Sequence, residues 1–177
     1  MMKYLLKWLI FGLAVFLLNQ AAQAIEIGEI PPKVELKEKL GGRVNGKPWS
    51  SEELHGKVHL LFYVDPDEKD TNNDTSDALD RENFPNDKLQ AVAIINMAAT
   101  WLPNFVISAA LKDKQKRYPE AIYVRDNKKV VVNAWKIADD SSNVLAFDKQ
   151  GKLFFRKDGK LTQEEIRTLI KVIRDHL

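Results

Sequence analysis

The feature that most constrains the fold is an apolar run from Val58 to Val64. The run is too short for a buried helix, and its apolar and polar side chains hardly alternate. That pattern is typical of a strand covered on both faces. A second run of this kind, Leu89 to Met97, follows a polar and acidic stretch over residues 65–87. The sequence therefore predicts two buried strands that lie side by side.

Helical spacing is found after each of these strands. A short helix is expected within Ser76 to Glu82, and a longer one from Asn104 to Arg117. The longer helix is expected to place four apolar residues inward: Phe105, Ile107, Ala110 and Leu111. Residues 121–124 read as a third strand, whereas 128–136 fit either a strand or a short helix. Strand–helix–strand units require parallel strands covered by helices.

Turn and capping signals define both ends of this region. Asn45-Gly46 predicts a small hairpin near its start. Residues 144–147 and 152–155 flank a turn that ends in Gly151, which predicts a late antiparallel hairpin. Thr162 and Glu165 form a capping box for a final helix. The expected fold is thus α/β, with a mixed central sheet, flanking helices and a C-terminal β-hairpin plus helix.

The first 24 residues have the three parts of a signal peptide. Lys3 and Lys7 give a positive start, an apolar run spans 8–18, and Ala22-Gln23-Ala24 suits cleavage before Ile25. The apolar run is shorter than the ~20 residues that a membrane-spanning helix needs. We therefore expect export, cleavage after Ala24 and no membrane association afterwards. The rest divides into an N-terminal segment, 25–40, and one domain, 41–177.

Charge and cysteine content exclude several classes of function. The chain has 27 Lys and Arg, of which Lys3 and Lys7 belong to the leader, so 25 basic residues remain against 25 acidic ones. A nucleic-acid-binding protein would carry a basic excess, so none is expected as a partner. The cysteine count is zero. Disulfides, thiolate–metal sites and thiol–disulfide exchange are therefore excluded.

Several stretches resemble known families. The first strand and the late hairpin are similar to the extracytoplasmic thioredoxin-like proteins of the TlpA type. The chain also resembles, more narrowly, the YtfJ-like family of small periplasmic proteins. The resemblance to the TlpA type lies in 56–63 and 144–153, and that to the YtfJ-like family in 45–49, 93–97 and 135–142 running on through Lys160-Leu161. Together they cover nearly all of residues 42–177.

The resemblance implies a signal peptide, a periplasmic location and a thioredoxin-like fold, but no particular activity. The reactive Cys-x-x-Cys of thioredoxins follows the first core strand, at the start of a helix. Here that segment reads Asp65-Pro66-Asp67-Glu68-Lys69-Asp70, with Asp67 and Asp70 near the positions of the two sulfurs. The loop in which thioredoxins carry a cis proline reads Asp140-Ser141-Ser142-Asn143. Both halves of the redox site are missing.

Topology suggests one ligand-binding site. Ligands of open α/β sheets bind beyond the carboxyl ends of the parallel strands. The residues expected there are Asp65, Asp67, Asn96, Thr100 and Trp101. A polar rim around an aromatic side chain could hold a periplasmic protein, a peptide or a small ligand. Alternatively, Trp101 and Met97 close the edge of the core and the acidic residues only cap helices.

The acidic loop suggests a second, calcium-binding site. Asp70, Asn72, Asp74 and Ser76 occupy alternate positions, as at the start of a calcium loop. The pattern then fails, because Thr75 stands where glycine is needed and Arg81 where a bidentate Glu is needed. A solvated polar loop is the alternative. Apart from this candidate calcium, no cofactor is expected.

Three functions are consistent with these patterns. The leading hypothesis is an exported binding or accessory module that keeps the thioredoxin scaffold without its chemistry. The second is a metal- or carboxylate-dependent enzyme that uses Asp65, Asp67 and Asp70. The third is a structural protein stabilised by calcium. No residue is assigned as catalytic, since the chain has no nucleophile elbow and no glycine-rich phosphate loop.

Overall fold

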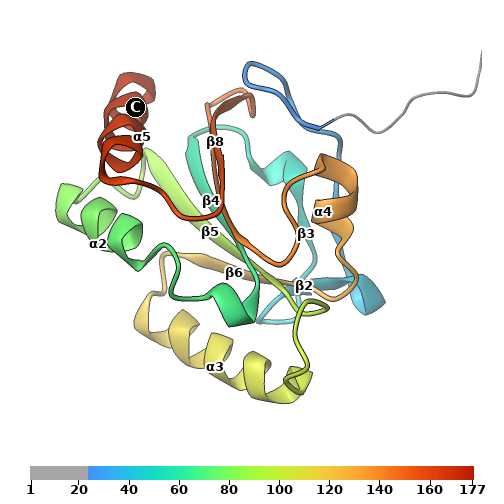
Figure 1. Ribbon diagram of the computed structural model, residues 1–177. Helices are drawn as coiled ribbons and strands as arrows, with labels where there is room; N and C mark the ends of the chain where they lie inside the picture. Colours follow the sequence, from blue (N-terminus) through green and yellow to red (C-terminus); the bar gives the residue numbers. More distant parts are fainter. Residues whose placement is uncertain (1–23) are drawn as a thin grey trace, which may run out of the picture.

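The computed structural model describes residues 24–177 (Figure 1). The predicted signal peptide lies outside these residues, except for Ala24. The strands are β1 (Glu35–Leu36), β2 (Gly41–Arg43), β3 (Trp49–Ser50), β4 (Val58–Val64), β5 (Leu89–Asn96), β6 (Ile122–Asp126), β7 (Ser142–Phe147) and β8 (Leu153–Asp158). The helices are α2 (Asn73–Glu82), α3 (Asn104–Arg117), α4 (Val130–Trp135) and α5 (Gln163–His176), with short 3₁₀ turns η1 (Glu38–Leu40), η2 (Ser51–Glu53) and η3 (Pro66–Glu68).

The central sheet is mixed, as the sequence predicts. Its strand order is β2-β6-β5-β4-β7-β8. β4 pairs parallel with β5, and β5 pairs parallel with β6, while the other pairs are antiparallel. The first four residues of β4 are all buried. A strand in the middle of a sheet with both faces covered has no polar face, which accounts for the continuous apolar run.

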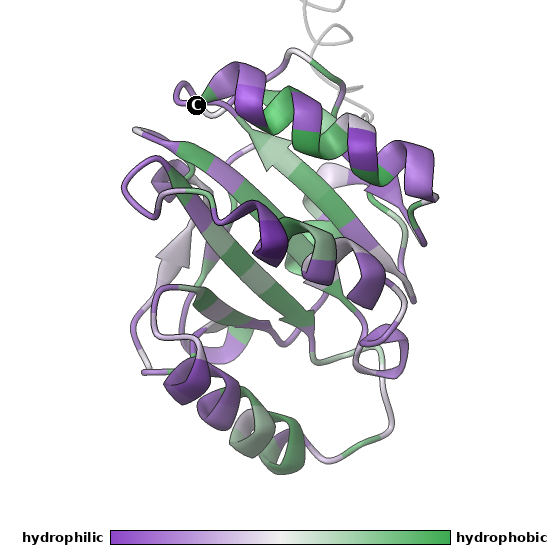
Figure 2. Ribbon diagram, turned by 90° about the vertical axis from the view of Figure 1, so that its left-hand side faces the viewer, coloured by the Kyte–Doolittle hydropathy of each residue, from purple (hydrophilic) through white to green (hydrophobic). Residues whose placement is uncertain are grey.

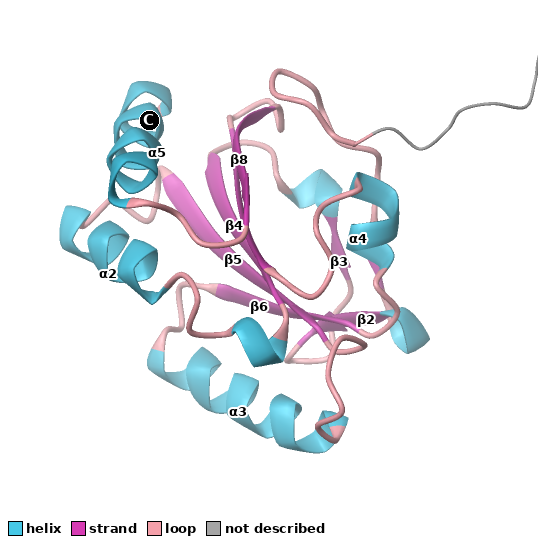
Figure 3. Cartoon of the chain, viewed as in Figure 1, coloured by secondary structure: helices cyan, strands magenta, loops and turns pink. Residues whose placement is uncertain are grey.

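Helices and the N-terminal segment cover opposite faces of this sheet (Figure 1). α2, α3 and α5 lie on one face, where α5 contributes Ile166, Leu169 and Ile173 to a buried cluster. α4, β1 and β3 lie on the other, around Trp49 and Trp135. Figure 3 shows the loops joining these layers mostly at the two ends of the sheet. The carboxyl ends of β4, β5 and β6 therefore lie together at one edge.

The N-terminal segment, 25–40, packs against the sheet. Its Ile25, Val34 and Leu36 are buried in the cluster around Trp135. The backbone N–H of Ile25 donates to the Trp135 carbonyl at 3.1 Å. β1 pairs with β3 in a small separate sheet, so that Leu36 lies beside Trp49. The segment thus holds Trp49 in place from outside the main sheet.

Two predictions of local structure hold only in part. Asn45-Gly46 forms a turn closed by the bond from the Arg43 N–H to the Lys47 carbonyl at 2.9 Å, but no ladder continues from it, and β2 pairs with β6 while β3 pairs with β1. In α3, Ile107 and Leu111 are buried as predicted, whereas Phe105 and Ala110 are exposed. The helix lies on the sheet through one narrow stripe, which leaves its other apolar residues in solvent.

Residues 130–135, which the sequence left open between strand and helix, form α4. The capping box of α5 is confirmed: the Glu165 backbone N–H donates to Thr162 Oγ1 at 3.2 Å, and the Thr162 backbone N–H donates to Glu165 Oε2 at 2.8 Å. These reciprocal bonds satisfy two donors that the first turn of a helix leaves unpaired.

Gly41 sits where only glycine fits. Its φ is +133°, and a Cβ at this position would lie 1.9 Å from the Arg125 carbonyl oxygen on the neighbouring strand. Gly46 also has a positive φ, +86°, but a Cβ there would meet nothing within 4 Å. A side chain at Gly41 would therefore meet both backbone strain and a steric clash, whereas a side chain at Gly46 would meet backbone strain alone.

We predict that Gly41→Ala lowers the free energy of unfolding by about 3 kcal/mol or more, because it adds a clash with backbone to the strain. Gly46→Ala should cost only about 1 to 2 kcal/mol, the strain alone. Urea denaturation followed by circular dichroism measures both. Equal losses in the two variants would contradict the close approach of β2 to β6.

Candidate functional site

The candidate site is built at the carboxyl edge of the parallel strands. Asp65 follows β4 directly, and Asn96 and Asp126, the last residues of β5 and β6, are paired in register. Side chains alternate between the faces of a strand, so Asp65 lies on the same face as Tyr63, and Asn96 on the same face as Ile94. Tyr63 and Ile94 are register partners. These polar residues consequently face the α4 side together, and all three are buried.

Asp126 is fully committed to holding this edge together. Its Oδ1 accepts the backbone N–H groups of Lys128 and Val130, at 3.1 and 2.9 Å. Its Oδ2 accepts the Val131 N–H at 2.9 Å and the Tyr63 hydroxyl at 3.1 Å. Burial and the Asp126 carboxylate raise the pKa of Tyr63, so the phenol stays a donor. Asp126 thus starts α4 and has no free lone pair for a ligand.

Asp65 is buried without a basic partner. Its Oδ1 accepts the Asp67 backbone N–H at 2.9 Å, which caps η3, and its own N–H donates to the Ser141 carbonyl at 2.9 Å. Burial raises the pKa of Asp65, and the nearby charges of Asp67, Asp140 and Glu68 raise it further. The hydrogen bond from the Asp67 backbone opposes this shift. The site therefore holds a carboxylate whose charge is poorly compensated.

Asn96 joins the edge to the loop before β7. Its Nδ2 donates to Asp139 Oδ1 at 3.0 Å, and Lys129 Nζ donates to Asp139 Oδ2 at 2.6 Å. Burial is the largest influence on the pKa of Asp139 and would raise it, but the bonds from Lys129, the Asp140 backbone and Asn96, with the charge of Lys129, together outweigh burial and lower the pKa. The Oδ1 of Asn96 is buried and accepts no hydrogen bond from the described chain, as is also true of Asn143 Oδ1. Two acceptors are left without donors here.

The outer part of the site is aromatic. Thr100 Oγ1 donates to Asp67 Oδ1 at 3.2 Å, which ties the β5–α3 loop to the segment after β4. The next residue, Trp101, is 85% exposed, and Phe105 is 75% exposed. Figure 2 shows the amino-terminal half of α3 as hydrophobic and the carboxyl-terminal half as hydrophilic. The alternative in which Trp101 closes the core is therefore wrong, because its side chain lies in solvent.

The structure brings most of the predicted ligand-binding residues into contact. Asp65 bonds to Asp67, and Asp67 bonds to Thr100 beside Trp101. Asn96 lies at the same edge and connects to Asp139. Sequence reasoning missed Asp126, Lys129 and Asp139 as members of this edge. An acidic residue a few positions before a helix is a signal for a helix start, and Asp126 stands in that position before α4. The sequence left residues 130–135 open between strand and helix, so this signal was not used.

The four residues proposed for calcium do not converge in a loop. Asp74 and Ser76 lie in the first turn of α2, while Asp70 is exposed and accepts from Lys69 Nζ at 2.8 Å. Asn72 points inward: its Nδ2 donates to the Ser142 and Gly159 carbonyls, and its Oδ1 accepts the Leu161 N–H at 3.0 Å. Within residues 24–177, no group of three or more His, Asp or Glu is placed to hold a metal. Asn72 alone of the four joins the start of α2 to the chain just before α5.

The chain matches a family model over residues 18–176, described as a bacterial protein of unknown function (YtfJ_HI0045). An uncharacterised protein of Haemophilus influenzae is 31% identical over 90% of this chain and 91% of its own length. The uncharacterised protein YtfJ of Escherichia coli is 29% identical over 72% of this chain and 71% of its own length. These relatives carry no assigned activity.

Solved structures resemble the fold at low identity. The thioredoxin domain of a thiol-disulfide oxidoreductase from Bacteroides vulgatus has a TM-score of 0.60 and 16% identity, covering 85% of this chain and 99% of the other. An exposed lipoprotein thioredoxin from Streptococcus pneumoniae has a TM-score of 0.57 and 14% identity, covering 81% and 99%. The fold is therefore thioredoxin-like, without a cysteine anywhere in the chain. The chain belongs to the bacterial YtfJ family of proteins of unknown function.

Proposed function

We propose that this protein acts outside the cytoplasm as a binding module, which holds an apolar, basic segment of a partner protein. The segment would lie on a surface formed by Asp67, Glu68, Thr100, Trp101 and Phe105, called here the Trp101 surface. The observation that carries the proposal is the exposure of Trp101, 85%, next to exposed acidic side chains.

The aromatic part of the Trp101 surface supports binding to protein. Trp101, Phe105 and Val106 are exposed on the β5–α3 loop and the first turn of α3. Large exposed apolar side chains in a group are typical of interaction sites, and tryptophan is the residue that most often dominates their binding energy. A single exposed leucine would need no explanation, whereas a neighbouring tryptophan and phenylalanine do.

The charge of the surface favours a basic ligand. Asp67 and Glu68 are exposed and form no ion pair within the described chain, whereas Lys69 is paired with Asp70. The side chain of Asp140 is 70% exposed, and its Oδ1 lies 3.5 Å from Lys129 Nζ, a long contact for an ion pair. Asp65, which accepts the Asp67 backbone N–H, is buried and forms no ion pair within residues 24–177. A lysine or arginine of the ligand would supply the missing positive charge.

The carboxylate-dependent enzyme is less well supported. It would use Asp65, Asp67 and Asp70, but Asp70 is exposed and bonded to Lys69. Acid–base catalysis by a carboxylate pair needs two groups held around one substrate. Of the two buried acids at this edge, Asp126 is filled by hydrogen bonds from the chain, so only Asp65 remains, beside the exposed Trp101 and Phe105. That arrangement favours binding over catalysis.

Export is supported by the leader and by the way the packed region begins. Ile25, the residue after the predicted cleavage site, is 5% exposed and its N–H donates to the Trp135 carbonyl. Cleavage before Ile25 would therefore leave a chain that starts where its core starts. In the part of the chain that the structure describes, we find no helix with the length and hydropathy to cross a membrane.

We predict that the protein expressed with its leader in a Gram-negative host is recovered by osmotic shock and begins at Ile25. Intact-mass measurement of the released protein checks this. Replacing Ala22 and Ala24 by leucine should leave the longer precursor in the membrane fraction, because a peptidase site needs small residues. A cytoplasmic protein with an intact leader would contradict export.

We predict that the Trp101 surface binds a fluorescein-labelled peptide of phenylalanine, lysine and glycine more tightly than its counterpart with glutamate for lysine. Fluorescence anisotropy measures the two affinities. Trp101→Ala should weaken binding about tenfold or more, about 1.4 kcal/mol. Asp67→Asn should weaken it and reduce its dependence on salt, because the variant keeps the acceptor for Thr100 but loses the charge.

The matched control is Tyr118→Ala, which removes an exposed aromatic residue just beyond the other end of α3. It should leave the affinity unchanged. Equal binding of the two peptides would contradict the basic ligand. Unchanged affinity in Trp101→Ala would exclude this surface.

A further prediction concerns the pH dependence of the free energy of unfolding. Because the folded-state pKa of Asp65 lies above the ordinary 3.8, the folded protein binds this proton more tightly than the unfolded chain does. The contribution of Asp65 to stability is then largest below pH 3.8 and falls as the pH rises through the folded-state value. Asp65→Asn should therefore stabilise the protein at neutral pH, and the gain should shrink in acid.

Asp70→Asn is the contrasting variant. The bonds from Lys69 and Asn73 lower the pKa of Asp70, so its removal should cost a little stability at neutral pH. Urea denaturation at several pH values measures both variants. A loss of stability in Asp65→Asn at neutral pH would show that the Asp65 charge is compensated after all.

A further inference from the structure

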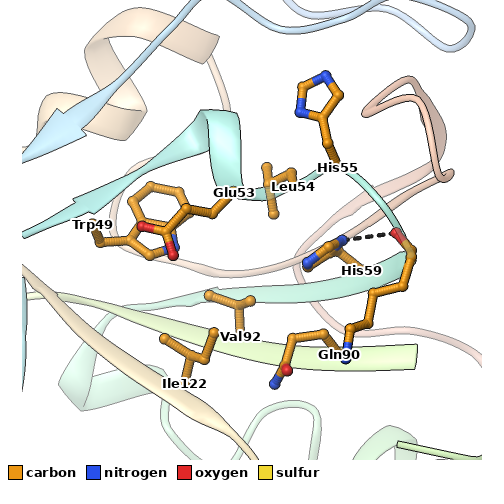
Figure 4. Close-up of a pocket in the computed structure, with 9 residues that line it drawn as sticks. Trp49, Glu53, Leu54, His55, His59, Gln90, Val92 and Ile122 are labelled. Atoms are coloured by element: carbon orange, nitrogen blue, oxygen red, sulfur yellow. Dashed lines mark hydrogen bonds between the residues drawn. The ribbon is translucent and has the colours of Figure 1, made fainter. Parts of the chain in front are cut away.

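A second candidate site lies at the opposite end of the same sheet. The amino-terminal parts of β4 and β5 form the floor of a pocket of about 190 Å³ (Figure 4). His59 and Gln90 are register partners on these strands, and Val92 is likewise the partner of Ile122 on β6, so their side chains share one face. Trp49 and Leu54 form the walls. In Figure 4, Trp49 and His59 stand on opposite sides of this space.

Trp49 brings an unused hydrogen-bond donor to the pocket. Its side chain is 1% exposed, and Nε1 has no partner among the described residues. A buried indole N–H normally finds an acceptor, and leaving a buried donor unpaired costs about 1 to 3 kcal/mol. Trp135, in the same core, follows the rule by donating to the Pro32 carbonyl at 2.8 Å. The indole N–H of Trp49 is therefore an exception to this rule, and a bound ligand could supply the acceptor that it lacks.

His59 brings an acceptor. Its Nδ1 lies 2.9 Å from the Lys57 carbonyl oxygen, which can only accept, so Nδ1 carries the hydrogen. Burial lowers the pKa of His59, although the bond to Lys57 opposes this, and the ring is neutral at neutral pH. The neutral tautomer leaves Nε2 as an acceptor, and no donor of the described chain bonds to it. His59 thus complements Trp49.

Gln90 brings a second acceptor next to His59. Its Nε2 donates to the Glu120 carbonyl at 2.6 Å and to the Ala91 carbonyl at 3.0 Å. Both bonds use the amide nitrogen, so the orientation of the side chain is fixed and Oε1 remains without a donor. Together with His59, Gln90 places two acceptors on the floor of a pocket that has apolar walls.

The charged residues at the rim are already engaged. Lys57 Nζ donates to the Asn86 carbonyl at 3.0 Å, and Glu53 accepts from the Ser50 backbone and from Arg43. His55 turns its ring away from the hollow in Figure 4, and bonds through Nδ1 to the Glu52 carbonyl at 2.9 Å. Glu53 is thus neutralised by Arg43, while Lys57 is bonded to a neutral carbonyl and keeps its charge at the rim. The groups that the described chain leaves unpaired inside the pocket, Trp49 Nε1 and the acceptors of His59 and Gln90, are all uncharged. The pocket therefore suits a neutral molecule.

We propose that this pocket binds a small uncharged ring compound that carries a hydroxyl group, of which phenol is the simplest member. The ring would pack against Trp49, Leu54, Val92 and Ile122. The hydroxyl can accept from an indole N–H and donate to an imidazole or amide acceptor, which is the set that the pocket leaves unpaired. Its volume is below the range of about 300 to 1,000 Å³ typical of drug-sized ligands, so the ligand is restricted to one small ring.

The test is a titration of the ¹⁵N-labelled protein with phenol, observed through the tryptophan indole N–H signals. These signals are assigned by Trp49→Phe, Trp101→Phe and Trp135→Phe. Phenol should shift the Trp49 signal saturably, with a dissociation constant of about a millimolar, and leave the Trp135 signal in place. Toluene, which lacks the hydroxyl, and benzoate, which is charged, should bind at least about tenfold more weakly.

Two variants locate the ligand. His59→Phe and Gln90→Leu should each weaken phenol binding about tenfold, and the unchanged Trp135 signal shows that the fold is kept. His55→Gln is the control and should bind like the wild type, because the His55 ring points away from the hollow and its Nδ1 is already bonded to the Glu52 carbonyl. Trp101→Ala should also bind like the wild type, which keeps this result independent of the Trp101 surface.

Three outcomes would overturn the proposal. The first is an unsaturable shift that is equal at all indole signals. The second is binding of toluene or benzoate as tight as that of phenol. The third is full phenol affinity in both His59→Phe and Gln90→Leu.

Discussion

The parallel pairing of β4 with β5 is the constraint on which the rest of the structure depends. This ladder joins Val58–Val64 to Leu89–Ile95, in the middle of the sheet. Its side chains reach the two larger buried clusters, since Leu61 and Tyr63 belong to one and Leu60 to the other. The two ends of a parallel pair differ chemically. The loops that lead into the following helices leave from the carboxyl end, and the segments that enter the strands arrive at the amino end. Both candidate sites lie at these ends.

Buried polar groups in this protein fall into two kinds. Asp126 and Asn72 have their hydrogen-bonding capacity filled by the chain itself, and each fixes an element in place, α4 in one case and the approach to α5 in the other. Trp49 Nε1 and Asn96 Oδ1 are buried and have no hydrogen-bond partner within residues 24–177, and Asp65 is buried beside the acidic residues Asp67, Asp140 and Glu68. Unpaired groups cost stability that a purely structural role would not require. This difference adds to the exposure of Trp101 and the shape of the Trp49 pocket in separating the candidate sites from the scaffold.

The sequence predicted the framework well where burial is two-sided or where a cap is local. β4 and α3 begin and end at the predicted residues, because a polar or proline residue stops each apolar run. The prediction that Phe105 is buried was wrong, because helical spacing shows which side of a helix is apolar but not how much of that side is covered. The turn at Asn45-Gly46 could be predicted because it is local. The sequence could not show that β2 pairs with β6 and β3 with β1, because these partners are distant in the chain. The Trp49 pocket could not be predicted, since only the tertiary register places His59 beside Gln90.

The absence of cysteine changes what the thioredoxin-like edge can do. A thiol enzyme can hold its substrate covalently through a mixed disulfide, so it needs little affinity from contact alone. A chain with Asp65 to Asp70 in that position has only non-covalent contact, and contact requires apolar area at the edge. Trp101 and Phe105 supply such area on the loop that Thr100 ties to Asp67. If the protein is the binding module proposed above, the exposed aromatic residues do by reversible contact what the cysteines of a thiol enzyme do by covalent capture.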